Sequence, residues 1–143
     1  REGREAFEVG ELATAEKKAT RVIGIAPNDI AARLLMGRAL LGQSKNSRAV
    51  DYLLAAVQAG GADAGIWFDL AKALQAHGQM QPALQALETA LRLDPANAEG
   101  WLMFVEAAER AGAIELGREA LAELRKCSPQ HPLIGELELR LSL

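Results

Sequence analysis

The chain has 143 residues, half of them hydrophobic, a length that suits a single domain with a sizeable core. No run approaches the roughly 18 to 20 apolar residues of a membrane span, so we expect no membrane insertion by this fragment. The net charge of −3 argues against a nucleic-acid partner, because binding nucleic acid needs a cationic surface. The chain has a single cysteine, which excludes an internal disulfide.

Breaks in the chain recur every 34 residues. Their positions are Pro27, Gly61, Pro95 and Pro129. A second series at the same interval contains Gly10, Ser44, Gly78 and Gly112, and a third contains Ala15, Ala49, Ala83 and Gly117. Because proline fixes φ and glycine frees it, both interrupt a helix, and three coincident series predict an internal repeat.

The segments between breaks are predicted to be helical, in chain order residues 1–29, 30–63, 64–97, 98–131 and 132–143. In the third segment, apolar residues recur at steps of three and four, as at Trp67, Leu70 and Leu74, which places them on one helix face. N-caps are expected at Asp63, Asn97 and either Asn28 or Asp29. The left-handed residues that close helices are expected at Gly10, Gly78 and Gly112. Each 34-residue unit is therefore predicted to hold two antiparallel helices joined by a short turn.

The third segment, "WFDLAKALQAHGQMQPALQALETALRLDP" at residues 67–95, resembles a tetratricopeptide repeat (TPR). The residues at the family's spacing are Trp67, Leu70, Ala71, Leu74, Ala83, Leu87, Ala90 and Pro95. The resemblance implies an all-α fold, a right-handed α-α superhelix (solenoid) of stacked antiparallel helix pairs, in one domain over residues 1–143.

The other units keep the pattern less completely. Residues 1–29 resemble a partial repeat that lacks its start, with Gly3, Ala6, Gly10, Ala15 and Pro27 in register. Residues 30–63 keep Gly37, Leu40, Ala49, Leu53 and Ala56, but have Arg33 in place of the aromatic residue and Gly61 in place of the proline. Residues 98–131 keep Trp101, Phe104, Leu121 and Pro129 and depart at Val105 and Gly117.

Two structures are compatible with the tail, residues 132–143. Leucines alternate from Leu137 to Leu143, which alone predicts a strand. Stacking favours a capping helix instead, in which Ile134, Leu137 and Leu141 cover the last pair. Leu139 and Leu143 then lie off that face, where they meet further chain or a second subunit, or belong to a frayed end. A homo-oligomer through this C-terminal helix is therefore one expectation.

No pattern for chemistry is present in the sequence. His77 and His131 are the only histidines, and neither has a second metal ligand at helical or turn spacing. The glycines do not form a phosphate-binding loop, and the serines have no base nearby in sequence. We therefore expect no metal, no cofactor and no catalytic residue, and not an enzyme. The chain begins with Arg1 rather than Met, so we expect it to be part of a longer protein.

The family resemblance implies that the first helix of each pair lines a concave groove that binds a peptide or a helix of a protein partner. The positions opposite the predicted core arc are Arg4, Phe7, Leu34, Arg38, Leu41, Phe68, Asp69, Lys72, Gln75, Leu102, Met103 and Glu106. Apolar anchors flanked by charges are what such recognition needs. The alternative is that the apolar members lie at the edge of the core and the charges are merely solvated.

The charges of these positions suggest a polarity for the partner. Arg4, Arg38 and Lys72 form a cationic row at the 34-residue interval, which Glu106 ends. Steering by this row favours a segment with acidic groups toward the Arg38 end. We expect Arg38→Glu combined with Lys72→Glu to weaken partner binding and leave the fold intact. Clamping of a terminal carboxylate, as in TPR proteins that bind chaperone tails, is not expected, because Leu34 occupies one of the matching places.

Two functions follow from these expectations. The first is a non-catalytic protein-interaction scaffold. The alternative is an accessory TPR region of a larger bacterial enzyme, such as a glycosyl- or sulfotransferase, in which the repeats position a protein substrate or mediate dimerisation.

Overall fold

The structure is a computed structural model that describes residues 2–60 and 63–142, with side chains described from Val9 onward. The described residues form eight α-helices and no strand. In chain order these are α1 (Glu2–Ile25), α2 (Ile30–Gly42), α3 (Asn46–Gln58), α4 (Ala64–Ala76), α5 (Met80–Leu93), α6 (Ala98–Arg110), α7 (Ile114–Cys127) and α8 (Ile134–Leu141).

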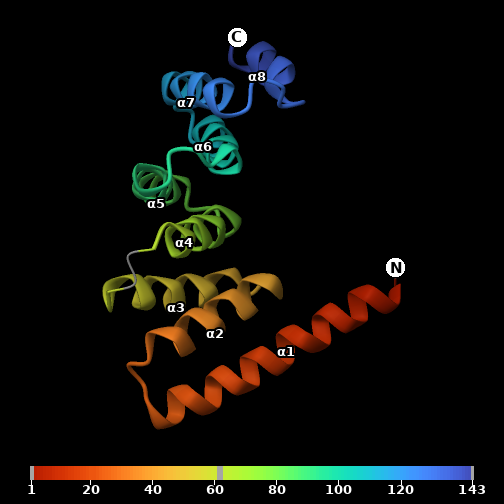
Figure 1. The fold of residues 1–143 in the computed structure, drawn as a ribbon, viewed down its shortest axis with the longest axis vertical. Coiled ribbons are helices and arrows are strands. Elements are labelled where there is room, and N and C mark those ends of the chain that lie inside the picture. Colours follow the sequence, from red (N-terminus) through yellow and green to blue (C-terminus); the bar gives the residue numbers. More distant parts are fainter. Residues whose placement is uncertain (1, 61–62, 143) are drawn as a thin grey trace.

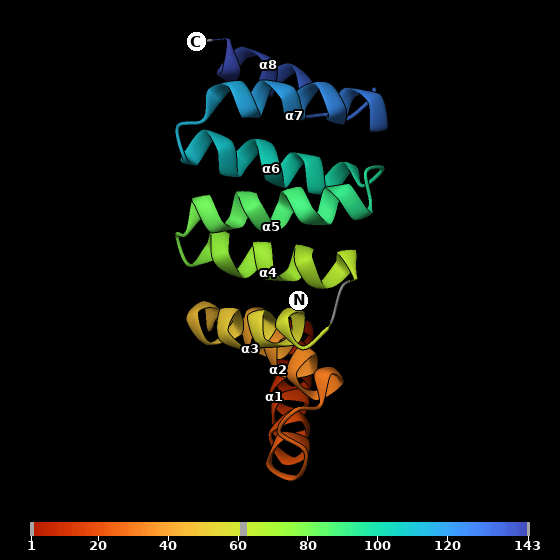
Figure 2. The same ribbon diagram turned by 90° about the vertical axis from the view of Figure 1, so that its left-hand side faces the viewer.

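The helices stack in sequence order, each packed against the one before and the one after it (Figure 1). Helices α4 to α7 lie as successive layers in the view of Figure 2. By the 34-residue register, α2, α4, α6 and α8 are the first helices of their pairs. The second helices are α3, α5, α7 and the C-terminal part of α1. The predicted all-α, right-handed solenoid of antiparallel helix pairs is confirmed.

The predicted N-caps are confirmed, and Asp29 rather than Asn28 is the first of them. The Asp29 carboxylate accepts from the Ala32 amide at 2.9 Å. Likewise Asp63 accepts from Gly65 N at 2.6 Å and Asn97 accepts from Gly100 N at 3.0 Å. Each cap satisfies an amide at the start of a first helix that has no partner within the helix, and this fixes where α2, α4 and α6 begin.

The turn inside each pair needs one residue with positive φ. Gly78 and Gly112 fill this place with φ of 84° and 75°, as predicted, and Ser44 takes it in the first pair with φ of 60°. The left-handed conformation destabilises a residue that has a Cβ by about 1–2 kcal/mol. The α2–α3 turn is therefore the one strained by its own sequence.

Ser44→Gly is expected to raise the free energy of unfolding by about 0.5–1 kcal/mol. Glycine adopts a positive φ without steric strain, and this relief outweighs the extra conformational entropy that glycine gives the unfolded chain. Gly78→Ala is the matched control, and it is expected to lower stability by about 1 kcal/mol because a Cβ there meets no atom within 4 Å, so only backbone strain acts. Urea melts monitored by circular dichroism measure both changes. A destabilised Ser44→Gly would refute strain at this turn.

The prediction that Gly10 closes a helix is wrong, because Gly10 lies inside the continuous helix α1. A single interior glycine costs about 1 kcal/mol, which the neighbouring helix-forming residues outweigh. In the other pairs, packing of the first helix on the second helix stabilises the turn at this position. Here the chain continues straight, and the N-terminal half of α1 extends beyond the helices it contacts (Figure 1).

The core is made by small residues of one helix that admit large residues of its partner. A Cβ built on Gly37 of α2 would lie 2.7 Å from Leu53 of α3. Leu53 and Leu87 are fully buried, and one apolar cluster continues from α1 to α6 while a second joins α6, α7 and α8. Trp101 packs against both clusters, so it lies where the two meet.

A side-chain hydrogen bond connects some first helices to the proline-containing loop that precedes them. Trp101 donates through Nε1 to the carbonyl of Pro95 at 2.8 Å. Arg33, which has the same place in the register, donates through Nε to the carbonyl of Pro27 at 2.9 Å. The Arg33 guanidinium therefore makes the same hydrogen bond that the Trp101 indole makes in its own unit. This explains why the unit with Arg33 tolerates the loss of the aromatic residue.

The tail forms helix α8, as stacking predicts, and the strand alternative is wrong. Ile134, Leu137 and Leu141 are buried against the last pair, whereas Leu139 is 72% exposed. Leu143 lies outside the described residues. The exposed Leu139 shows that one face of α8 is open. Within the described ranges, no helix is both long enough and apolar enough to cross a membrane.

Candidate protein-interaction surface

The predicted binding residues that the structure describes lie on the three first helices α2, α4 and α6, and we call their exposed parts the first-helix surface. Its members are Leu34, Arg38, Leu41, Asp69, Lys72, Gln75, Leu102, Met103 and Glu106. Arg38 and Lys72 are exposed, and the others are half-buried. The four apolar members contact the core with one side, so they lie at the edge of the core and keep part of their surface accessible.

Phe68 does not contribute to this surface, and two further predicted members cannot be placed on it because their side chains are outside the described residues. Phe68 is only 8% exposed, because its ring packs into the core beside Gly100, where an added Cβ would come within 2.5 Å of it. The prediction that Phe68 faces a partner is therefore wrong. Arg4 and Phe7 lie on α1, and their side chains are outside the described residues.

The cationic row is weaker than its sequence suggests. Arg38 Nε donates to Asp69 Oδ2 at 2.6 Å, which joins α2 to α4. This ion pair neutralises Arg38 locally, so Lys72 is left as the cation of the middle helix, and it pairs with no carboxylate among the described residues. Attraction of acidic groups to the Arg38 end stays a prediction, and the ion pair with Asp69 reduces the charge that Arg38 offers for it.

Gln75 and Glu106 meet in a shallow hollow of about 380 Å³ at the far end of the surface. Glu109, Arg110 and Arg140 complete its lining. Arg140 of α8 binds Glu109 of α6, with Nε at 3.1 Å from Oε2, and its bonds to this carboxylate raise the pKa of Arg140. The hollow therefore has both signs of charge and several hydrogen-bonding groups.

Arg140 was not among the predicted residues, although a sequence signal for it exists. The pairs Arg38–Asp69 and Glu109–Arg140 are both separated by 31 residues. Each pair thus joins a residue of one first helix to a residue of the next first helix that lies three positions, or about one helical turn, before its register equivalent. Scanning for opposite charges at 31 residues, three fewer than the repeat, would have identified both ion pairs.

An apolar slot of about 440 Å³ lies on a different part of the stack, between α3 and α5 over α4. Val50, Leu54, Trp67 and Pro82 contribute to its walls, and its polar lining residues are uncharged. The matching place between α1 and α3 is bridged by Glu16, which lies 3.6 Å from Lys45 and 3.7 Å from Arg48.

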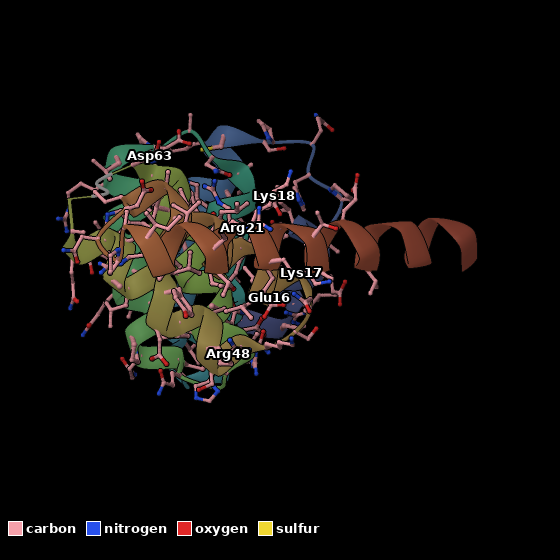
Figure 3. All side chains as sticks on the ribbon, turned by 90° about the horizontal axis from the view of Figure 1, so that it is seen from below. Glu16, Lys17, Lys18, Arg21, Arg48 and Asp63 are labelled. Carbon is pink, nitrogen blue, oxygen red and sulfur yellow. The ribbon has the colours of Figure 1, made fainter. Side chains whose placement is uncertain are left out.

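The bridge at Glu16 anchors α1 to the stack. Gln43 Nε2 donates to Glu16 Oε2 at 3.0 Å, and this bond, with the two cations, lowers the pKa of Glu16. Figure 3 shows Glu16 and Arg48 from the α1 end of the molecule. The ion pairs hold the second-helix part of α1 in place. Within the described part of the chain, no three His, Cys, Asp or Glu residues are grouped as a metal site would require.

Comparison with known proteins identifies the family of the chain. The family model for the tetratricopeptide repeat matches residues 1–64 and 68–132. A crystal structure of MamA superposes with a TM-score of 0.84 at 20% identity, over 94% of this chain and 81% of that one. MamA from Desulfovibrio magneticus RS-1 gives 0.78 at 22% identity, over 86% and 70%.

YrrB, described as a TPR protein with an unusual peptide-binding site, gives a TM-score of 0.79 at 20% identity over 86% of this chain and 63% of that one. No curated protein sequence matches the chain. At these identities the solved structures establish the fold only. The family match covers nearly the whole sequence, and together with the stacked helix pairs it shows that the chain belongs to the tetratricopeptide repeat family.

Proposed function

We propose that the chain is a non-catalytic interaction scaffold that binds a peptide or a helix of a partner protein across the first-helix surface. The observation that carries the proposal is the arrangement of half-buried apolar side chains beside charges that the chain leaves accessible. Leu34 and Met103 are apolar anchors whose inner sides are already fixed by the core, so little side-chain entropy is lost when a partner covers them.

The charges define the partner in more detail. Lys72 favours an acidic group at the middle of the bound segment, and the hollow at Gln75 and Glu106 accepts a hydrogen-bonding or basic group beyond it. Such a segment has apolar residues between charged ones, as an amphipathic helix does. The peptide site ascribed to YrrB is a precedent on the same fold. The chain's net charge of −3 favours a protein over a nucleic acid.

We further propose one domain over residues 1–143, with repeats at 30–63, 64–97 and 98–131, a partial repeat before them and a capping helix after them. Neither the comparisons nor the structure offers support for the alternative function, an accessory region of a larger enzyme.

Selection of a phage-displayed peptide library on the immobilised chain provides ligands with which to test the surface. Titration calorimetry then compares the wild type with Lys72→Glu and Met103→Asp. Each substitution is expected to weaken binding at least tenfold, roughly 1.4 kcal/mol, because it reverses the accessible cation or removes an anchor. Leu54→Asp, which alters an exposed leucine of α3, is the control and should leave affinity unchanged.

Arg38 requires a different substitution from the one suggested by its sequence position. Arg38→Glu would place two carboxylates together at Asp69, so a loss of binding could reflect a disturbed helix contact. The double exchange Arg38→Asp with Asp69→Arg keeps the ion pair and reverses its direction. Peptides that bind every first-helix variant as tightly as the wild type, or that lose affinity only for Leu54→Asp, would refute the proposed surface.

A further inference from the structure

The open face of α8 is a first-helix face that no described second helix covers. In the 34-residue register Leu139 corresponds to Gly37, Ala71 and Val105 of the earlier first helices. All three are buried, and Gly37 lies against Leu53 of the second helix of its own pair. Leu139 is 72% exposed, and a hollow of about 460 Å³ lies beside it, lined also by Arg118, Arg125 and Glu138.

Helix α1 has the opposite deficiency, because its second-helix part packs on α2 but no described first helix precedes it to complete a pair. Val22 corresponds in register to Ala56, Ala90 and Leu124 of the later second helices, which are fully buried. Val22 itself is 40% exposed. Ala15 is likewise half-buried where Ala49 and Ala83 are fully buried. The two ends of the stack therefore expose the two halves of one kind of interface.

We propose that α8 of one molecule docks on α1 of a second copy and forms the helix pair that each lacks. The contact would continue the interface that already joins α2 to α3, α4 to α5 and α6 to α7. The two helices lie at opposite ends of the stack (Figure 1), so one molecule can use both ends at once. Such a head-to-tail contact is heterologous, and it builds open chains rather than closed dimers.

Residue size at the expected contact differs from that at the contacts inside the chain. Inside the chain, a small residue of the first helix faces a leucine of the second, as Gly37 faces Leu53. At the position of Leu53, α1 has the small residue Ala19, and at the position of Gly37, α8 has the large residue Leu139. Ala19 is already fully buried within the chain, so Leu139 would lie beside it, against the accessible residues Ala15 and Val22 of α1.

Charge also favours contact between the opposite ends. Lys17, Lys18 and Arg21 of α1 are exposed, appear together on this helix in Figure 3, and pair with no carboxylate among the described residues. Residues 1–61 have a net charge of +2 from 9 Lys/Arg and 7 Asp/Glu, and residues 62–143 a net charge of −5 from 7 and 12. Opposite charges at the two ends speed a head-to-tail encounter and disfavour contacts between like ends.

Sedimentation velocity of the 143-residue chain over a range of concentrations tests the proposal. The wild type should show an average mass that rises with concentration beyond that of two chains. Val22→Glu blocks the α1 end and Leu139→Glu blocks the α8 end, so each variant alone should remain monomeric. Leu93→Glu is the matched control, since Leu93 is an exposed leucine of α5 away from both ends, and it should assemble as the wild type does.

The decisive experiment mixes the two blocked variants in equal amounts. Each retains one intact end, so the mixture should form a complex of two chains and nothing larger. Circular dichroism confirms that both variants keep their helices. A wild type that stays monomeric at every concentration, a Leu139→Glu variant that assembles like the wild type, or a mixture that remains monomeric would overturn the proposal.

Discussion

Leu87→Ala is expected to lower the free energy of unfolding by about 3–4 kcal/mol, one of the largest effects available to a single substitution in this chain. Leu87 of α5 is fully buried in the main apolar cluster, where it packs between successive helices. Removing its three outer carbons loses their burial and leaves a cavity that tightly packed neighbours fill only in part.

Urea denaturation followed by circular dichroism at 222 nm measures this loss. Leu93→Ala is the matched control, because Leu93 lies on the same helix but is 53% exposed, and it should change stability by less than about 1 kcal/mol. Because neighbouring pairs stabilise one another in a repeat protein, the slope of the transition should also be compared. Equal effects of the two substitutions would show that the core does not lie where α5 faces α4.

Trp101→Ala is expected to lower the free energy of unfolding by about 3 kcal/mol, at the lower end of the range for a large aromatic residue because the indole is only half-buried. The indole touches both apolar clusters, and its ring centroid is 6.4 Å from that of Phe104. It also donates to the Pro95 carbonyl. Its removal should therefore weaken the contact between the last pair and the rest of the stack.

Trp101→Phe separates packing from hydrogen bonding at this joint. It retains an aromatic ring and loses the Nε1 donor, so it should cost about 1 kcal/mol. Comparing the denaturation of both variants with that of the wild type gives the two contributions. A loss below 1 kcal/mol for Trp101→Ala would contradict the role of this residue in joining the two clusters.

Much of the candidate surface followed from helical periodicity, but its electrostatics did not. The 34-residue register placed Lys72 and Glu106 on first helices, where Lys72 is exposed and Glu106 is half-buried. It could not reveal that Arg38 pairs with Asp69, because the ion pair depends on the distance and rotation between α2 and α4. Phe68 was misplaced for a similar reason, since Gly100 of the next first helix creates a space that draws the ring into the core.

The sequence by itself determined the repeat, the helix pairs and their N-caps. These features depend on spacing, on backbone freedom and on side chains that bond within a few residues. Only the tertiary structure decided that α1 continues through Gly10 without a turn, which charges neutralise one another, and which apolar residues remain open at the two ends. Those outcomes depend on which helices have neighbours, and a local pattern cannot specify what is packed against it.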